Sequence, residues 1–387
     1  MGDARMRRLR LADGLEEVTK GVGSAWRQYR LVGATREGLA PAKEGIGKNP
    51  ERYKLVAPGT IFYNPMRILL GSIALLDAGQ EPGITSPDYV VFRARPGLIH
   101  PRWFYYWLRS EQGAAFVRTL ARGAVRERML FRRLAAVEAE VPAFEFQQGF
   151  ASVVEPLERA CAAAEAQLAV ADALAVAYIR SVFEESRTRA WPTRRLADEC
   201  TLLPSRSIAS DGDTVVLAIT TACLTETGFR PEGVKPARMS AASAAQCIVR
   251  RGEVLVARSN TTELVGRACL FDGNPPGAVA SDLTIRVETG TKIYAPFLAA
   301  LLSFLYVTGY WRERSGGASG SMKKITRSQL ASQAILVPEL EVQKRVCAEL
   351  SERLSSVERI KRTVDTQLRT MAAPREALLR RAFSGEA

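Results

Sequence analysis

The chain is poor in the residues that most metal sites and nucleophilic sites use. Its 387 residues include one histidine, His100, and six cysteines, none of which forms a C-x-x-C pair. Zinc sites need several clustered Cys and His ligands, and disulfide-stabilised secreted domains are rich in closely spaced cysteines. We therefore expect free buried thiols, no metal and no cofactor.

Long apolar runs are also missing. No segment has the roughly 18 uninterrupted apolar residues of a membrane span, and the N-terminal residues lack the apolar stretch of a signal peptide. The sequence thus predicts a cytoplasmic protein with no membrane partner. A hydrophobic content of 47% and the length of the chain allow two or three domains with real cores.

Recognisable catalytic motifs are absent as well. GNPPGA at 273–278 has the N-P-P core of a methyltransferase loop, but Gly277 stands where an aromatic side chain must stack on the flipped base. EGIGKNP at 44–50 lacks the first glycine and the hydroxyl of a phosphate-binding loop. No carboxylates pair at a spacing typical of acid–base catalysis. We expect that the protein is not an enzyme; a nuclease or methyltransferase with an unrecognised motif is the alternative.

Positive charge is in excess. The sequence has 54 Lys and Arg residues against 41 Asp and Glu, which gives a formal net charge of +13 and an isoelectric point near 9.7. Such a balance favours a polyanionic partner or an anionic membrane surface. A solvated basic surface without a partner is the other interpretation.

One sequence pattern occurs twice. Residues 123–150, GAVRERMLFRRLAAVEAEVPAFEFQQGF, align without a gap on residues 319–346, with Met129 on Ile325 and Gln147 on Gln343. Both copies have a basic loop, an apolar strand, a proline and an amphipathic helix. The halves differ most in residues 18–56 and 203–250. This pattern predicts an internal duplication. Its two copies share a framework and differ in the inserts, residues 18–56 and 203–250.

Each copy continues into a long heptad pattern. Apolar residues spaced three and four apart run from Phe150 to Val182 and from Leu350 to Met371, which predicts two long helices. The first seam is rich in Ala and the second in Leu and Val, so the helices could pack small residues against large ones. We expect Pro156 and Pro374 to kink or restart them. Coiled-coil dimerisation, in an interaction scaffold that binds no DNA, is the alternative.

Basic and hydrogen-bonding residues recur at matching places in the two halves. Arg, Lys, Asn and Ser are the usual ligands of phosphates, and Arg, Asn and Ser also read base edges in the major groove. Two modules of one fold with different surface residues would bind two short DNA sequences at a fixed distance. The predicted DNA-binding residues are Asn64, Arg67, Ser86, Arg122, Arg126 and Arg128 in the first half, and Arg258, Ser259, Asn260, Ser281, Ser319, Ser321, Lys323 and Lys324 in the second.

The order of these motifs resembles that of a known family. TSPDYVVFR is followed by a basic loop and by a strand that ends in VPAFEFQQGF; GGASGSMKKITRSQL then leads to ILVPELEVQKRV and to the closing LLRRAFSGE. Over nearly the whole chain this order resembles the specificity subunit of type I restriction-modification enzymes. The first basic loop departs from the pattern, because AVRERMLF stands where the second copy has the more typical SGSMKKIT.

The resemblance implies a mixed α/β architecture in four segments. Two target recognition domains, at 1–142 and 191–338, would be separated by two long antiparallel coiled-coil helices at 143–190 and 339–387. The family is non-catalytic and directs adenine methylation, and cleavage with a motor-nuclease subunit, to a bipartite DNA site. The implied partners are double-stranded DNA and two modification subunits, and whether a motor-nuclease subunit joins them stays open. Candidate docking residues on the helices are Leu157, Leu168, Leu354 and Leu368.

Overall fold

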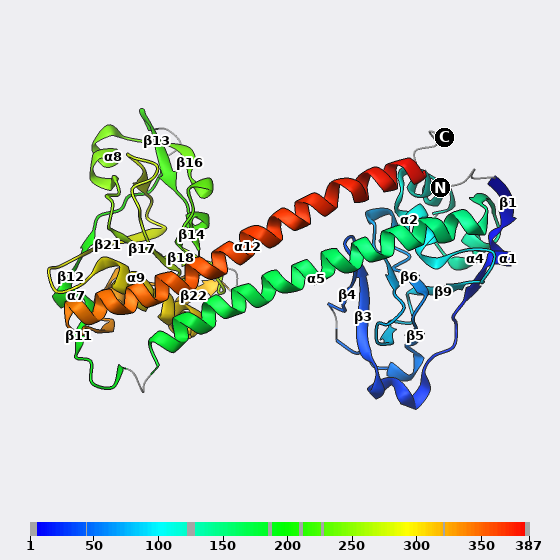
Figure 1. Ribbon diagram of the computed structural model, residues 1–387, viewed down its shortest axis with the longest axis horizontal. Coiled ribbons are helices and arrows are strands. Elements are labelled where there is room, and N and C mark those ends of the chain that lie inside the picture. Colours follow the sequence, from blue (N-terminus) through cyan, green and yellow to red (C-terminus); the bar gives the residue numbers. More distant parts are fainter. Residues whose placement is uncertain are drawn as a thin grey trace. The chain divides into compact units, whose positions relative to one another are not determined.

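The protein is described here by a computed structural model. It describes residues 6–43, 45–121, 128–184, 188–208, 212–225, 228–319 and 322–383. The chain divides into two compact units, the first made of Met1–Ala163 and Gln367–Ala387, the second of Ala164–Thr366. Each unit mixes helices and strands (Figure 1). Because each unit takes part of both long helices, the predicted division into four segments stays a prediction.

A four-stranded antiparallel sheet forms the centre of the first unit. In its middle strand β6 (Thr60–Tyr63), alternate side chains belong to different cores, as the two-residue period of a strand requires. Ile61 and Tyr63 pack with the aromatic residues of helix α2, whereas Phe62 packs toward a second sheet. The strand order is β2-β9-β6-β7, with β2 at Leu15–Glu17, β9 at Val90–Ala94, β7 at Ile73–Leu76 and α2 at Pro101–Arg109.

The second sheet of the first unit has one parallel pair. Strand β3 (Arg30–Thr35) pairs parallel with β8 (Gly83–Thr85) and antiparallel with β4 (Gly38–Pro41). Much of this sheet comes from the first divergent insert. The remaining elements of the unit are β1 (Met6–Arg10), paired with β10 (Glu138–Pro142), and α1 (Leu11–Gly14), η1 (Gly23–Gln28), η2 (Pro50–Arg52), β5 (Lys54–Val56), η3 (Ile68–Leu70), α3 (Glu111–Leu120) and α4 (Phe131–Ala135).

The second unit has sheets of corresponding strand order. Its central antiparallel sheet is β12-β21-β17-β19, and its second sheet is β16-β13-β20, in which β13 pairs parallel with β20 and antiparallel with β16. Helix α9 (Ala295–Val307) packs on the central sheet as α2 does in the first unit. The strands are β12 (Cys200–Leu203), β21 (Thr284–Thr289), β17 (Val254–Ala257), β19 (Ala268–Leu270), β16 (Lys235–Met239), β13 (Thr214–Ile219) and β20 (Val279–Ala280).

Shorter elements complete the second unit. Strand β11 (Thr193–Arg195) pairs with β24 (Ala334–Leu336), as β1 pairs with β10 in the first unit. The others are α7 (Leu196–Glu199), η4 (Thr221–Cys223), β14 (Leu224–Thr225), β15 (Gly228–Phe229), η5 (Pro231–Gly233), α8 (Ala241–Cys247), β18 (Ser259–Asn260), α10 (Tyr310–Arg314), β22 (Gly316–Ser319), β23 (Met322–Lys324) and α11 (Arg327–Ala331).

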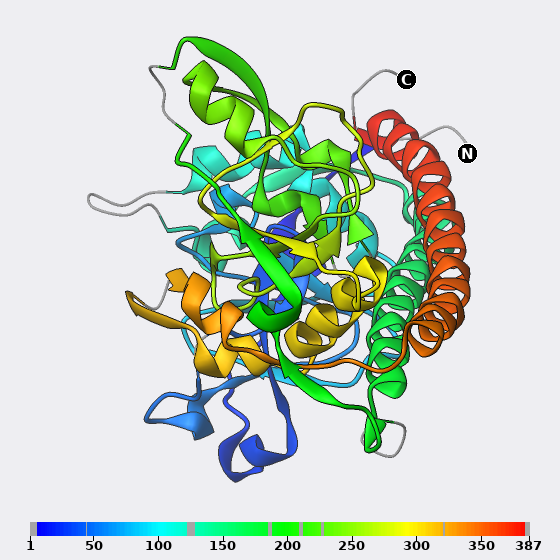
Figure 2. The ribbon, with the colours of Figure 1, turned by 90° about the vertical axis from the view of Figure 1, so that its left-hand side faces the viewer.

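Two long helices contribute to both units. Helices α5 (Phe144–Val182) and α12 (Leu340–Phe383) each continue through their internal proline, so neither restarts there. They run side by side in both views (Figures 1 and 2). In the first unit the rings of Phe150 and Phe383 lie 5.4 Å apart, and Glu158 Oε1 lies 3.8 Å from Arg375 Nη2. In the second unit Asp172 Oδ1 lies 2.5 Å from Lys361 Nζ, and the Tyr178 ring centre lies 5.3 Å from the Arg353 guanidinium. The helices therefore run antiparallel where they meet in each unit.

Helix α5 is unusually apolar. By length and composition it could cross a membrane, and it is the one such helix in the described part of the chain. This is a weak indication, because a core helix of a protein that never enters a membrane passes the same test. In the second unit its residues Ala171 and Ala175 pack against Val357 of α12, which is the small-against-large packing that the sequence predicts.

Candidate nucleic-acid interface

In the second unit, the pairing of two short strands brings four predicted DNA-binding residues next to one another. Strand β18 pairs antiparallel with β23, which places Ser259 opposite Lys324 and Asn260 opposite Lys323. These two lysines are 63 positions or more from their partners in the sequence, yet they lie on one short sheet with β22, to which Ser319 belongs. Lys324 is exposed and Lys323 half-buried. Ser321 lies outside the described residues.

Arg258 holds this sheet against a neighbouring turn. Its backbone N–H donates to Leu283 O at 2.8 Å, and its Nη1 donates to Asp282 O at 3.1 Å. Its own carbonyl accepts from the N–H of Ile325 at 2.8 Å. Ser281 begins the turn, is buried and accepts from the N–H of Leu283 at 3.3 Å. The Arg258 and Ser281 side chains therefore position the backbone.

Lys324 is therefore the exposed hydrogen-bond donor of this site. Lys323 and Asn260 are partly exposed beside it. Ser259 is buried, and its hydroxyl has no hydrogen-bond partner among the described residues. Arg327 adds to the local positive charge: burial, and then the nearby Arg258, lower its pKa from the usual value. A group of cations on a surface attracts phosphate.

The first unit shows a comparable loop contact. The N–H of Met129 donates to Pro65 O at 3.0 Å, at the place where Ile325 contacts Arg258 in the second unit. The contact keeps the loop after β6 in place beside Arg128. Asn64 Oδ1 accepts from the N–H of Met66 at 3.0 Å. Arg67 and Arg128 are exposed, Asn64 and Ser86 are half-buried, and Arg122 and Arg126 lie outside the described residues.

Other basic residues of the inserts were not predicted. In the first insert the Arg27 guanidinium lies 4.8 Å from the centre of the Trp26 ring, in the stretch AWRQYR. In the second insert Lys235 and Arg238 are exposed on β16. Basic residues beside aromatic residues are typical of nucleic-acid surfaces, so this composition was an available signal. Recurrence between the two halves does not reveal these residues, because the two inserts differ in sequence.

The predicted docking leucines lie partly exposed on the long helices. Leu157 and Leu368 belong to the first unit, Leu168 and Leu354 to the second, and all four are half-buried. Leu354 also packs on the core of the second unit. Fully buried leucines would be inaccessible to a partner, whereas half-buried ones keep some apolar surface free.

Two buried ion networks are structural. Arg286 and Glu253 form a bidentate pair, and both side chains are 3% exposed. In the first unit Arg102 pairs with Asp77 and with Glu158. Burial raises the pKa of Glu158 although Arg102 opposes the shift. Within the described part of the chain, no group of three His, Cys, Asp or Glu residues could hold a metal ion. The exposed predicted DNA-binding residues, such as Arg128 and Lys324, instead offer hydrogen-bond donors to anions.

Comparison with known proteins identifies the fold. No protein-family model and no curated protein sequence matches the chain. A chain from a structure reported on complex assembly and conformational transition of the type I R-M system aligns with a TM-score of 0.56 at 16% identity, covering 100% of both chains. The S subunit of a type I restriction-modification system from M. genitalium aligns with a TM-score of 0.57 at 12% identity, covering 99% of this chain and 97% of that one. The resemblance inferred from the sequence is confirmed at the level of the fold.

Proposed function

We propose that the chain is the non-catalytic, DNA-reading specificity subunit of a type I restriction-modification system. The observation that supports this best is the agreement of fold with a type I S subunit over nearly the full length of both chains. A shared fold leaves the function to be argued from the site. The net charge of +13 and the exposed cations at corresponding loops of the two units favour DNA as the ligand.

Each unit would read one half of a bipartite site. The two units have corresponding sheets, which supports a tandem duplication, whereas their inserts differ in sequence and in surface residues. Different surfaces on a common frame suit two different short sequences. In this proposal the predicted DNA-binding residues of the loops contact phosphates and base edges, with Lys323 and Lys324 among the phosphate ligands.

The long helices would set the distance between the half-sites and dock partners. Two modification subunits would bind the half-buried leucines of α5 and α12 and methylate adenines, and a motor-nuclease subunit would join them for cleavage. The complex would work in the cytoplasm, where its DNA substrate is found. Half-buried apolar residues on long helices are suited to a second chain, since interface cores are more apolar than the average surface.

Mapping of modified adenines in cells with and without this chain tests the proposal. We expect modification at one split sequence that disappears when the chain is removed. An unchanged modification pattern would contradict it. Two alternatives give different results: methylation or cleavage by the purified chain alone indicates an enzyme, and failure to shift any duplex in an electrophoretic assay indicates a scaffold.

A further inference from the structure

Helices α2 and α9 occupy equivalent places in the two units, as one contact shows directly. In the first unit Arg109 Nη1 donates to the carbonyl of Ile73 on the edge strand β7, at 3.3 Å. In the second unit Ser303 Oγ donates to the carbonyl of Ala268 on the edge strand β19, at 3.0 Å. The same edge carbonyl is thus bound by a long side chain in one unit and by a short one in the other.

The first unit fills the space beside this contact with large side chains. Arg102 pairs with Asp77 and Glu158, and the Tyr106 hydroxyl donates to Glu158. The Arg109 guanidinium lies 5.2 Å from the centre of the Tyr105 ring. Two phenol rings and two guanidinium groups, with one acceptor carboxylate on α5, therefore occupy this place.

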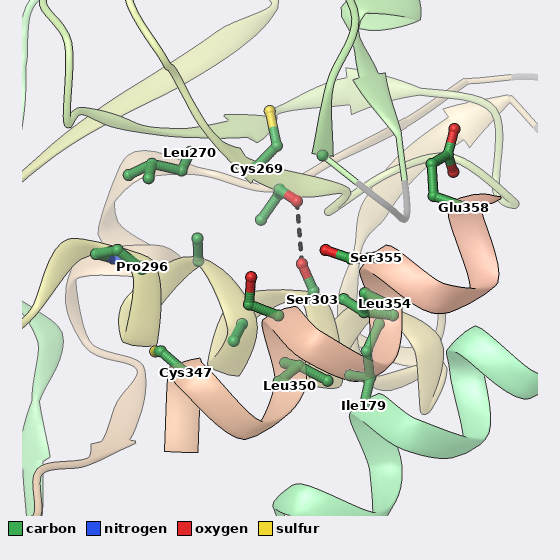
Figure 3. A pocket seen from close by; sticks show the side chains of 15 residues that line it. Ile179, Cys269, Leu270, Pro296, Ser303, Cys347, Leu350, Leu354, Ser355 and Glu358 are labelled. Carbon is green, nitrogen blue, oxygen red and sulfur yellow. Dashed lines mark hydrogen bonds between the residues drawn. The ribbon is translucent and has the colours of Figure 1, made fainter. Parts of the chain in front are cut away.

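The second unit has small residues at the same helix positions. Counting from the first residues of the two helices, Pro296, Ala299, Ala300 and Ser303 of α9 stand where α2 has Arg102, Tyr105, Tyr106 and Arg109. These four residues line a cavity of about 330 Å³ between α9, α12 and β19 (Figure 3). The cavity is the space that the smaller side chains leave.

The body of this cavity is apolar. Leu270 of β19 and Leu350 and Leu354 of α12 line it, together with Cys269 and Cys347. Burial raises the pKa of both thiols, that of Cys347 to about 12, so they are uncharged at neutral pH. Uncharged buried thiols behave as small apolar groups.

One end of the cavity is acidic. Ser355 and Glu358 follow one another along α12 at this end (Figure 3). Glu358 Oε2 is buried and has no hydrogen-bond partner among the described residues, while Oε1 lies 3.9 Å from Arg362 Nε. No lysine or arginine is among the residues that line the cavity. An anionic ligand is therefore disfavoured, and a free carboxylate oxygen remains for a donor.

We propose that this cavity binds a small organic cation with an aromatic body, an arylalkyl amine or guanidine. Its ring would lie between α9 and α12, where the first unit places Tyr105 and Tyr106, and its charged group would meet Glu358 at the acidic end. The cavity is at the lower end of the sizes usual for small-molecule sites. Apolar walls with one placed polar group are also typical of such sites. The proposal rests on the second unit alone and is independent of DNA binding.

Calorimetric titration with two probes tests it. Tyramine carries an ammonium group, and tyrosol is the same phenol with a hydroxyl in its place. We expect tyramine to bind roughly tenfold more tightly than tyrosol, because a hydrogen bond to a charged group is worth about a factor of ten or more. Equal affinity for the two probes, or no binding of tyramine, would overturn the proposal.

Two variants locate the binding. E358Q should bring the affinity for tyramine down to that for tyrosol, whereas E352Q, which removes an exposed charge from α12 outside the cavity, should leave both unchanged. A300Y refills the cavity with the residue of the first unit and should abolish binding of both probes. If A300Y does not fold, E358Q still decides, because the Glu358 side chain is 31% exposed and its loss perturbs no core. Tyramine binding that survives E358Q would contradict the assignment.

Discussion

Gln147 and Gln343 make the same three hydrogen bonds in the two units. Both side chains are completely buried in the first turn of a long helix. Each amide oxygen accepts from the N–H of a residue just before helix α2 or α9, and each amide nitrogen donates to two carbonyls. The partners are His100 N, Leu98 O and Pro142 O for Gln147, at 2.7, 3.3 and 2.9 Å, and Tyr294 N, Lys292 O and Pro338 O for Gln343, at 2.8, 2.9 and 2.7 Å.

These glutamines should be important for stability. Q147A or Q343A removes the partner of one backbone N–H and a donor from each of two carbonyls, including a buried one, Pro142 O or Pro338 O. In Q147A, Leu98 O keeps Arg7 Nη2 as a donor, at 2.8 Å. We expect each to lower the free energy of unfolding by about 3 kcal/mol, since an unsatisfied buried group costs about 1–3 kcal/mol. Urea denaturation measures this, with Q148A, at an exposed neighbouring position, as the control. A decrease no larger than that of Q148A would contradict the role.

His100 should make the stability of the first unit depend on pH. Burial, and then the nearby Arg102, lower its pKa below the usual value, although Glu155 opposes the shift. The unfolded chain therefore takes up a proton below about pH 6.5 that the folded chain does not yet bind. The free energy of unfolding should fall as the pH falls from about 6.5 toward the lowered pKa, and it should be independent of this group above that range.

The variant H100Y, which copies Tyr294 of the second unit, tests this expectation. Urea midpoints at pH 7.5 and 5.5 should differ less for H100Y than for the unaltered protein, which has no other histidine. Equal decreases in both proteins would assign the pH dependence to carboxyl groups instead.

The buried pair of Arg286 and Glu253 should be sensitive to the removal of one partner. R286V leaves Glu253 as an unpaired charge in the core, and we expect the free energy of unfolding to fall by about 3–5 kcal/mol. The first unit has Val91 and Thr60 at the corresponding strand positions. The double variant R286V/E253T should therefore be more stable than R286V alone, by denaturant unfolding. A double variant that is less stable than R286V would show that the unpaired Glu253 charge does not cause the destabilisation of R286V.

The sequence predicted the two long helices, because their formation depends on residues that are close together in the chain. The heptad spacing of apolar residues predicted both long helices, because helical periodicity appears directly in the sequence. We expected Pro156 and Pro374 to kink or restart the helices; the restart was wrong, because both helices continue through their proline, and a kink stays a prediction. A proline removes one hydrogen bond of a helix, and the packing of residues such as Phe150 and Ala171 stabilises α5 on both sides of Pro156.

The sheets of the inserts could not be predicted in the same way. Strand β3 lies parallel to β8, and β13 lies parallel to β20, in each case with a long stretch of chain between them. Such pairings depend on contacts between distant residues, which no local period records. The two inserts therefore share a topology although their sequences showed no likeness.

Only part of the candidate interface could be predicted, because the rest also depends on contacts between distant residues. Recurrence in the two halves identified Lys323 and Lys324, which strand pairing does bring beside Asn260 and Ser259. It could not show that Arg258 and Ser281 use their side chains within the fold, because burial and hydrogen bonds follow from tertiary structure. Whether these residues contact DNA stays a prediction.

Salt dependence tests the electrostatic part of the proposed function. Removing one phosphate ligand should flatten the slope of log K against log salt by about 0.9. K324A removes an exposed cation of β23, so we expect weaker binding and a flatter slope in fluorescence anisotropy titrations with duplex DNA. K344A is the matched control, because Lys344 lies 2.8 Å from Glu341 on α12. Equal slopes for K324A and the unaltered protein would exclude Lys324 as a phosphate ligand.

The most direct test of the specificity-subunit proposal lengthens both long helices at the boundaries of the units. Seven residues are inserted after Ala163 in α5 and after Thr366 in α12, which keeps the heptad seams in phase and adds about 10 Å. Modified adenines are then mapped in cells. We predict unchanged half-sites whose gap is longer by about three base pairs. Altered half-sites, or an unchanged gap, would contradict the assignment of the units as readers and of the helices as the spacer.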